Sequence, residues 1–136
     1  MGQTRPYLSV YDEPLWAGFE QDELRLQKGS QSGKFRYPPS PLDPDTLEMV
    51  PIEDLASEFE TVSGKGEIYS WCVFHRQYFD DKPVPYNVIT VKLDEGPYFV
   101  SNLVGDMPEG ELIGRRVEAV YEPYQGRKII KFRLAE

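Results

Sequence analysis

The chain has 136 residues, and its 23 Asp and Glu against 15 Lys and Arg give a formal net charge of −8. This length suits one domain, or one domain with a small appendage, and the acidic balance argues against nucleic acid as a partner, because phosphate contacts need a broad positive field. The sequence has no apolar run near the roughly 18 residues of a membrane span and no basic-then-apolar start, so we expect a cytoplasmic protein without a membrane partner.

The first predicted element is a short helix. Asp12 stands at its expected N-cap, and Pro14 falls in the first turn, where the missing N–H of proline does no harm. Leu15, Trp16 and Phe19 follow at helical spacing and give the helix an apolar face. Such a face predicts a helix that docks onto another surface.

A hairpin is predicted next. Residues 24–27 and 34–37 alternate apolar and polar side chains around a Gly- and Ser-rich stretch at 29–33. Four prolines then follow within residues 38–44, and this density predicts an extended connector with few backbone hydrogen bonds. We therefore expect a first domain over residues 1–46 and a second over residues 47–136.

Five short strands are predicted in the C-terminal half, each rich in β-branched and aromatic residues. They are Gly66–His75, Tyr86–Leu93, Tyr98–Val104, Arg116–Glu122 and Lys128–Leu134. The second and third should be antiparallel neighbours, because residues 94–97 have the length of a tight turn and Gly96 can adopt a positive φ. Residues 106–114 are long enough for a helical turn. Five strands with this interruption predict a mainly β protein built on an OB-fold barrel.

Alternation within these runs predicts which side chains face the core. In the second strand Ile89 and Val91 share one face, which should be buried. In the last strand Phe132 points one way while Lys131 and Arg133 point the other. The barrel should therefore carry a basic strip on its outside.

The single cysteine and the single histidine, Cys72 and His75, are not expected to form a catalytic pair. Cys72 lies in an apolar run and should be a small buried hydrophobe, so neither an internal disulfide nor a thiolate-rich metal site can form. Three residues apart on a strand, the two side chains would point to opposite faces. The clustered carboxylates fall in predicted loops, where such charges are solvated. We find no complete catalytic constellation, and we expect no enzyme activity from the chain itself.

Several stretches, taken in order, resemble a known family. They are Gly66–Trp71 leading to His75–Arg76, then Pro85–Tyr86, Leu93–Gly96, Ser101–Gly105 and Lys131–Arg133, preceded by Leu26–Lys28 and Arg36–Pro39. From Pro14 to Leu134 their order and spacing are similar to the thiolase-associated family catalogued as domain of unknown function 35. The resemblance implies an N-terminal helix, a rubredoxin-like zinc ribbon and an OB-fold.

The ribbon is where this sequence departs from the family. The family's two cysteine pairs, each with two residues between its members, correspond to Gly29, Ser32, Asp43 and Thr46. These residues do not supply the thiolate or imidazole ligands of a structural zinc site, so we expect a metal-free hairpin. Metal binding normally stabilises such small ribbons, and we expect apolar packing to replace it. The side chains expected to pack are Leu24, Leu26, Phe35 and Tyr37.

The resemblance implies a non-catalytic accessory subunit of lipid metabolism. Its partner would be a thiolase-fold enzyme (a thiolase, synthase or retro-aldolase) acting on acyl-CoA, and the resulting hetero-oligomer could hold two copies of the chain. No bound cofactor is expected, although a coenzyme A thioester is a possible ligand. Buried anchors for the partner are expected from the helix and hairpin. These residues are Trp16, Phe19, Leu24 and Tyr37.

Two groups of residues are candidates for contact with coenzyme A. Trp71 could stack on the adenine ring or pack in the core or a subunit interface, and Arg76 could hold a phosphate or pair with Asp80 or Asp81. The basic strip near the C-terminus could guide phosphates or pair with neighbouring carboxylates such as Glu118 and Glu122. The complete set is Trp71, His75, Arg76, Arg127, Lys128 and Lys131.

Two other functions stay open. An OB-fold module could bind nucleic acid, which the acidic composition opposes. A stand-alone acyl-CoA-binding or hydrolysing protein would need, for hydrolysis, a base and an oxyanion site that we cannot assemble from this sequence.

Overall fold

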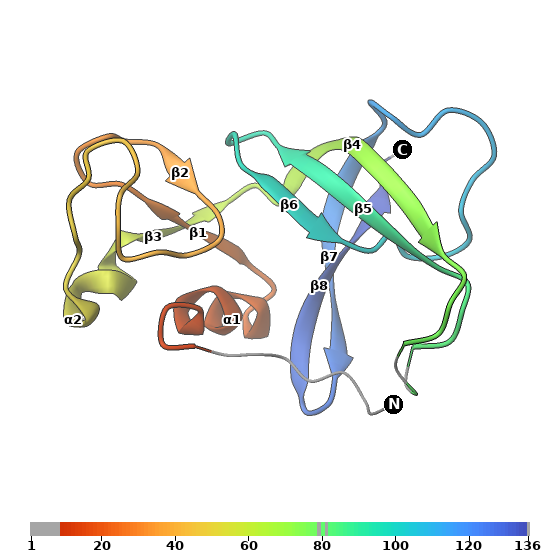
Figure 1. The fold of residues 1–136 in the computed structure, drawn as a ribbon, viewed down its shortest axis with the longest axis horizontal. Coiled ribbons are helices and arrows are strands. Elements are labelled where there is room, and N and C mark those ends of the chain that lie inside the picture. The colour runs from red at the N-terminus through yellow and green to blue at the C-terminus, as the bar shows by residue number, and fades with distance from the viewer. Residues whose placement is uncertain (1–8, 79, 81, 136) are drawn as a thin grey trace.

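The computed structural model describes residues 9–78, 80 and 82–135, which form two β-sheets and a few short helices (Figure 1). The elements in chain order are α1 (Glu13–Glu20), β1 (Leu24–Lys28), β2 (Phe35–Arg36), α2 (Ile52–Leu55), the 3₁₀ turn η1 (Ala56–Glu58), β3 (Phe59–Val62), β4 (Lys65–Phe74), β5 (Tyr86–Leu93), β6 (Tyr98–Ser101), β7 (Arg116–Tyr124) and β8 (Arg127–Leu134). None of the helices in the described ranges is long and apolar enough to cross a membrane.

Helix α1 forms where we predicted it, but its N-terminus is held differently. The Asp12 side chain does not cap the helix; its Oδ2 accepts a hydrogen bond of 3.0 Å from the Ser9 hydroxyl. Leu15 and Phe19 are buried, and the helix contacts β1 and β8. Figure 1 shows α1 between the small sheet and the end of the β7–β8 hairpin, where it joins the two halves of the molecule.

The predicted hairpin is present as β1 and β2, and it belongs to a three-stranded sheet in the order β2-β1-β3. Leu24 and Leu26 are buried, and Phe35 and Tyr37 pack against the same core, as expected. The third strand, β3, pairs with β1 from Leu24 opposite Val62 to Gln27 opposite Phe59. The small sheet therefore draws on residues well beyond position 46, where we expected the first domain to end.

The remaining strands form the barrel, in the order β6-β5-β4-β7-β8. A parallel bridge between Leu103 and Phe132 brings the end of the third barrel strand against the fifth, which gives the closure of an OB-fold. The predicted fold is confirmed. Ile89, Val91 and Phe132 are completely buried, as the alternation predicted.

The helical turn expected over residues 106–114 is absent. Pro108 has no N–H to donate, and Gly110 and Gly114 adopt positive φ values of 91° and 89°, which do not fit a right-handed helix. The segment is a loop that inserts Leu112 into the core, and the Gly114 N–H donates to the Ile68 carbonyl at 2.8 Å. The loop is therefore anchored to the barrel without regular structure.

Cys72 was expected in the core, but its side chain is exposed. The reason is a β-bulge in β4: Ile68 pairs with Val91, whereas Ser70, and not Tyr69, pairs with Thr90. The extra residue inverts the alternation beyond it, so Cys72 lies on the outer face of the barrel.

Candidate functional site

A cleft lies between the loop that joins β4 to β5 and the turn that joins β7 to β8. Its volume is about 360 Å³, and we call it the loop cleft. The Lys82 ammonium lies 5.5 Å from the centroid of the Tyr124 ring and so brings the two loops together. Its lining residues are Lys82, Pro83, Pro85, Tyr86, Asn87, Asn102, Leu103, Tyr124, Ile129 and Lys131. These two loops flank the usual ligand surface of OB-folds.

Two asparagines fix the wall of the loop cleft. The Asn87 side chain pairs with the backbone of Leu103: its Nδ2 donates to the carbonyl at 2.9 Å, and its Oδ1 accepts from the N–H at 2.7 Å. Asn102 donates in return to the Asn87 carbonyl. These contacts replace the ladder hydrogen bonds that β6 no longer makes, because β6 ends at Ser101. The cleft wall is therefore tied to β5 by side chains.

The loop cleft contains two cationic side chains in a chain that is acidic overall. Lys131 lines it while pairing with the Glu122 carboxylate at 3.1 Å, and Lys82 stands over the Tyr124 ring. Asparagine and tyrosine groups supply neutral hydrogen-bonding partners at its edge. These side chains suit a small ligand that has an anionic or polar part and an apolar part. They suit a highly charged polymer less well.

The structure does not gather the six predicted coenzyme A contacts into one site. Lys131 lines the loop cleft. Arg127 is exposed at the start of β8. Lys128 is held by the end of α1 and the turn that follows it: its N–H donates to Glu20 at 3.0 Å, and its Nζ pairs with Asp22 at 2.8 Å. Together with Lys131–Glu122, the Arg133–Glu118 pair at 2.6 Å matches the alternative in which the strip is neutralised by neighbouring carboxylates.

The other three candidates lie at the end of β4. Trp71 is 44% exposed, so it is not a core residue of this chain. His75 and Arg76 are exposed in the following loop, where the Arg76 guanidinium lies 5.3 Å from the centroid of the Tyr78 ring. The alternative pairing with Asp81 falls outside the described residues. None of these three side chains lines the loop cleft.

A second hollow, which we call the helix groove, lies between α1 and the barrel and has a volume of about 320 Å³. Trp16, Phe19 and Tyr37, three of the four predicted partner contacts, line it. Burial and the nearby Asp12 carboxylate raise the pKa of Tyr37, which keeps its hydroxyl neutral. Phe19 and Leu24 are only 2% and 1% exposed, which corrects their expected role: their side chains belong to the chain's own core and cannot anchor a partner.

The helix groove adjoins an exposed apolar surface on the outside of the barrel. Tyr69 of β4 and Tyr98 of β6 are in contact, with ring centroids 4.8 Å apart, although they are 56% and 47% exposed. Val100, which also lines the groove, is 58% exposed. We call Tyr69, Tyr98 and Val100 the outer patch. Apolar side chains grouped in this way on a small protein are typical of contact surfaces.

Nucleophiles and metal ligands are sparse in these hollows. Among the described residues, no group of three or more His, Cys, Asp or Glu side chains could hold a metal ion. Cys72 and His75 are both exposed and neither lines the loop cleft or the helix groove. The loop cleft and the helix groove are lined by side chains suited to binding.

The fold thus defines an OB-fold barrel with an N-terminal helix and a small hairpin sheet. Comparison with known families agrees, since the profile of the family described as "ChsH2, C-terminal OB-fold domain" matches residues 59–122. A solved structure entitled "Ltp2-ChsH2(DUF35) aldolase" superposes on 97% of this chain and 100% of its own, with a TM-score of 0.80 and 28% identity.

Two curated relatives extend the comparison. The "3-oxo-4,17-pregnadiene-20-carboxyl-CoA hydratase alpha subunit" of Mycobacterium tuberculosis is 33% identical over 117 residues. The "DUF35 domain-containing scaffold protein" of Methanocaldococcus jannaschii is 38% identical over 68 residues, 48% of this chain. The chain spans 35% and 48% of their lengths. These comparisons confirm the resemblance to the family with domain of unknown function 35 that the sequence indicated.

Proposed function

We propose that this chain is a non-catalytic accessory subunit that assembles with a thiolase-fold enzyme acting on acyl-CoA. The observation that carries the proposal is the likeness over the whole chain to the DUF35 chain of the Ltp2-ChsH2 aldolase structure. The names of the two curated relatives, a subunit of a CoA-thioester hydratase and a scaffold protein, point in the same direction. The binding surfaces and sparse reactive groups of the barrel support a role in assembly and positioning.

We assign the partner contact to the outer patch and the adjoining helix groove. The patch offers exposed apolar side chains, and the groove adds Trp16 and Tyr37 at its edge. Large aromatic side chains that fill pockets at the centre of an interface usually carry most of its binding energy. Complex formation would cover Val100 and Tyr98, which are otherwise exposed to water.

We assign coenzyme A, where it meets this subunit, to the loop cleft. Lys131 and Lys82 provide cationic groups for a phosphate, and the Asn87 and Asn102 amides that line the same cleft suit the amide-bearing arm of the molecule. The acidic surface elsewhere would keep polyanions such as nucleic acid from binding. The contact would orient the thioester for the partner.

The test is a purification of the tagged chain from its native cells, followed by mass spectrometry of the proteins that remain bound. We expect a thiolase-fold polypeptide, and acyl-CoA turnover by the complex but not by the isolated chain. Val100→Glu should weaken the complex at least tenfold. Ile113→Glu is the matched control, because Ile113 is equally exposed but lies on the 106–114 loop.

A further inference from the structure

Two turns of the N-terminal half have the same backbone geometry. In the first, the Gly33 N–H donates to the Gly29 carbonyl at 2.9 Å; in the second, the Leu47 N–H donates to the Asp43 carbonyl at 2.8 Å. The last residue of each turn is left-handed, with φ of 71° at Gly33 and 61° at Leu47. Leu47 adopts this conformation without being glycine, which indicates that its surroundings hold it there.

The first and fourth residues of these turns are Gly29 and Ser32 in one turn and Asp43 and Thr46 in the other. They lie around the Asp43 carboxylate. Asp43 Oδ2 accepts a hydrogen bond of 3.2 Å from Ser32, and Asp43 Oδ1 accepts from the N–H groups of Asp45 and Thr46 at 2.9 and 3.4 Å. A Cβ atom at Gly29 would lie 2.2 Å from Asp43 Oδ2 and 2.4 Å from Ser32 Oγ. The carboxylate and hydroxyl thus occupy the space of a side chain at position 29.

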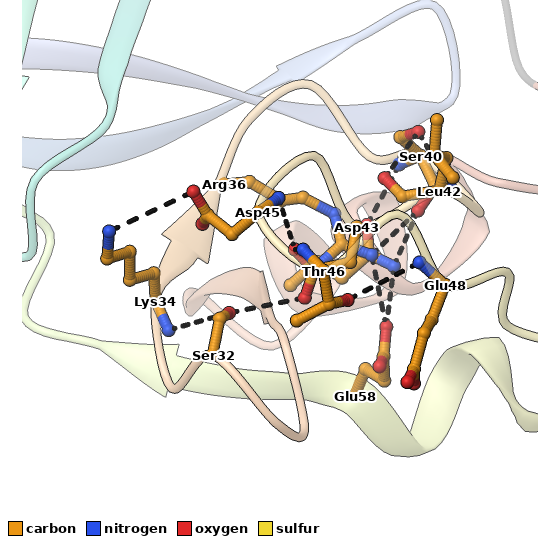
Figure 2. A network of polar contacts seen from close by, with 11 residues as sticks. Ser32, Lys34, Arg36, Ser40, Leu42, Asp43, Asp45, Thr46, Glu48 and Glu58 are labelled. Atoms are coloured by element: carbon orange, nitrogen blue, oxygen red, sulfur yellow. Dashed lines mark hydrogen bonds and ion pairs between the residues drawn. The ribbon is translucent and has the colours of Figure 1, made fainter.

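A second layer of buried polar groups surrounds this carboxylate (Figure 2). Arg36 Nη1 lies 3.9 Å from Asp43 Oδ2, while Arg36 Nη2 pairs with Glu58 at 3.3 Å and donates to the Ser40 carbonyl at 2.9 Å. The side chains of Arg36, Asp43 and Glu58 are only 11%, 7% and 8% exposed. This largely buried guanidinium lies between the two carboxylates and offsets one of their two negative charges without a metal ion.

Gln27 connects this layer to the small sheet. It is completely buried; its Nε2 donates to both Glu58 and the Ser40 carbonyl at 2.8 Å, and its Oε1 accepts from the Ser40 N–H at 2.8 Å. The network therefore joins β1, β2 and the proline-rich connector to the residue that precedes β3. Breaking it would leave buried donors and acceptors without partners.

We propose that this Asp43-centred network holds the two turns together in the place that a bound ion would take, so that the N-terminal half folds without metal. The guanidinium of Arg36 stands where it would repel a cation, and Asp43 already uses both oxygens as acceptors. The four positions 29, 32, 43 and 46 keep a convergent geometry, but a carboxylate fills its centre.

Thermal unfolding of the whole chain tests the proposal. Asp43→Ala should lower Tm by about 5–10 °C, since a buried network loses its centre. Asp45→Ala, in the same turn but at an exposed residue, should change Tm by about 1 °C or less. EDTA should leave the wild-type Tm unchanged. An unchanged Tm in Asp43→Ala, or a wild-type protein that loses stability in EDTA, would overturn the proposal.

A second variant, Gly29→Ala, tests the same carboxylate independently if Asp43→Ala folds poorly. In the wild type it should lower Tm by about 5 °C or more, because the new methyl displaces the carboxylate. In the Asp43→Ala protein, the Gly29→Ala change should lower Tm by less than half of that amount. Equal losses in both backgrounds would show that the carboxylate does not fill this space.

A gain of function tests the convergent geometry itself. Gly29→Cys, Ser32→Cys, Asp43→Cys and Thr46→Cys, combined in a Cys72→Ser background, should bind one cobalt ion and show the thiolate-to-cobalt absorption of a tetrahedral site. The Cys72→Ser protein alone should bind none. A folded quadruple variant without this absorption would show that the four positions do not converge as we describe.

Discussion

Asn87 should be the most sensitive position of the loop cleft, and Asn87→Asp is the sharpest test of how that wall is built. The exchange keeps the shape of the side chain but replaces the Nδ2 donor by an oxygen. That oxygen would face the Leu103 carbonyl, which now accepts a hydrogen bond of 2.9 Å. The bond of 2.7 Å from the Leu103 N–H to Oδ1 can persist.

The expected loss of stability follows from these two hydrogen bonds. Removing one partner of a half-buried hydrogen bond costs about 1–3 kcal/mol, and the facing carboxylate and carbonyl oxygens add repulsion. We therefore expect Asn87→Asp to lower the free energy of unfolding by about 2–3 kcal/mol at pH 7. Protonation would restore a donor, so the difference from wild type should shrink at pH 4.

Urea unfolding of both proteins at pH 7 and pH 4 measures this difference directly. Gln31→Glu is the control, because it makes the same amide-to-acid exchange on an exposed loop residue and should stay within about 0.5 kcal/mol. An Asn87→Asp protein as stable as wild type at pH 7, or one whose deficit grows at pH 4, would refute the described role of Asn87.

Three further predictions concern the core, a tyrosine and the loop cleft. Gly66→Ala should destabilise the barrel by about 3 kcal/mol in urea unfolding, because a Cβ there would lie 2.4 Å from the Lys92 carbonyl oxygen. Burial raises the pKa of Tyr121 to about 12, so the free energy of unfolding should fall by about 2–3 kcal/mol as pH rises from about 10 to 12, and Tyr121→Phe should lack this decline. Lys131→Glu should weaken acyl-CoA turnover by the assembled enzyme about tenfold through KM, whereas Arg133→Glu, which lies outside the cleft, should leave KM unchanged.

The fold was largely predictable because its signals are local. Period-two alternation located β5 and β8, and the spacing around Gly96 defined the turn between β5 and β6. The position of Cys72 could not be predicted in the same way. A bulge after Ile68 inverts the face of every later residue in β4, and nothing in the local pattern of apolar residues marks it.

The site was predictable only in part because it depends on contacts between distant segments. Lys131 was found from charge patterning, but the pairing of Asn87 with Leu103 needs the barrel to close. A signal was present, since Tyr86–Asn87 and Ser101–Asn102 fall in or next to stretches that resemble the family. The Asp43 network was missed for a related reason: its partner Glu58 lies beyond the connector, on the far side of the expected boundary.

The most direct test of the account is native mass spectrometry of the chain purified from its own cells, with acyl-CoA turnover measured on the same sample before and after separation. We predict a complex that contains a thiolase-fold subunit, turnover by that complex, and none by the separated chain. A chain that purifies alone and turns over acyl-CoA by itself would contradict the account.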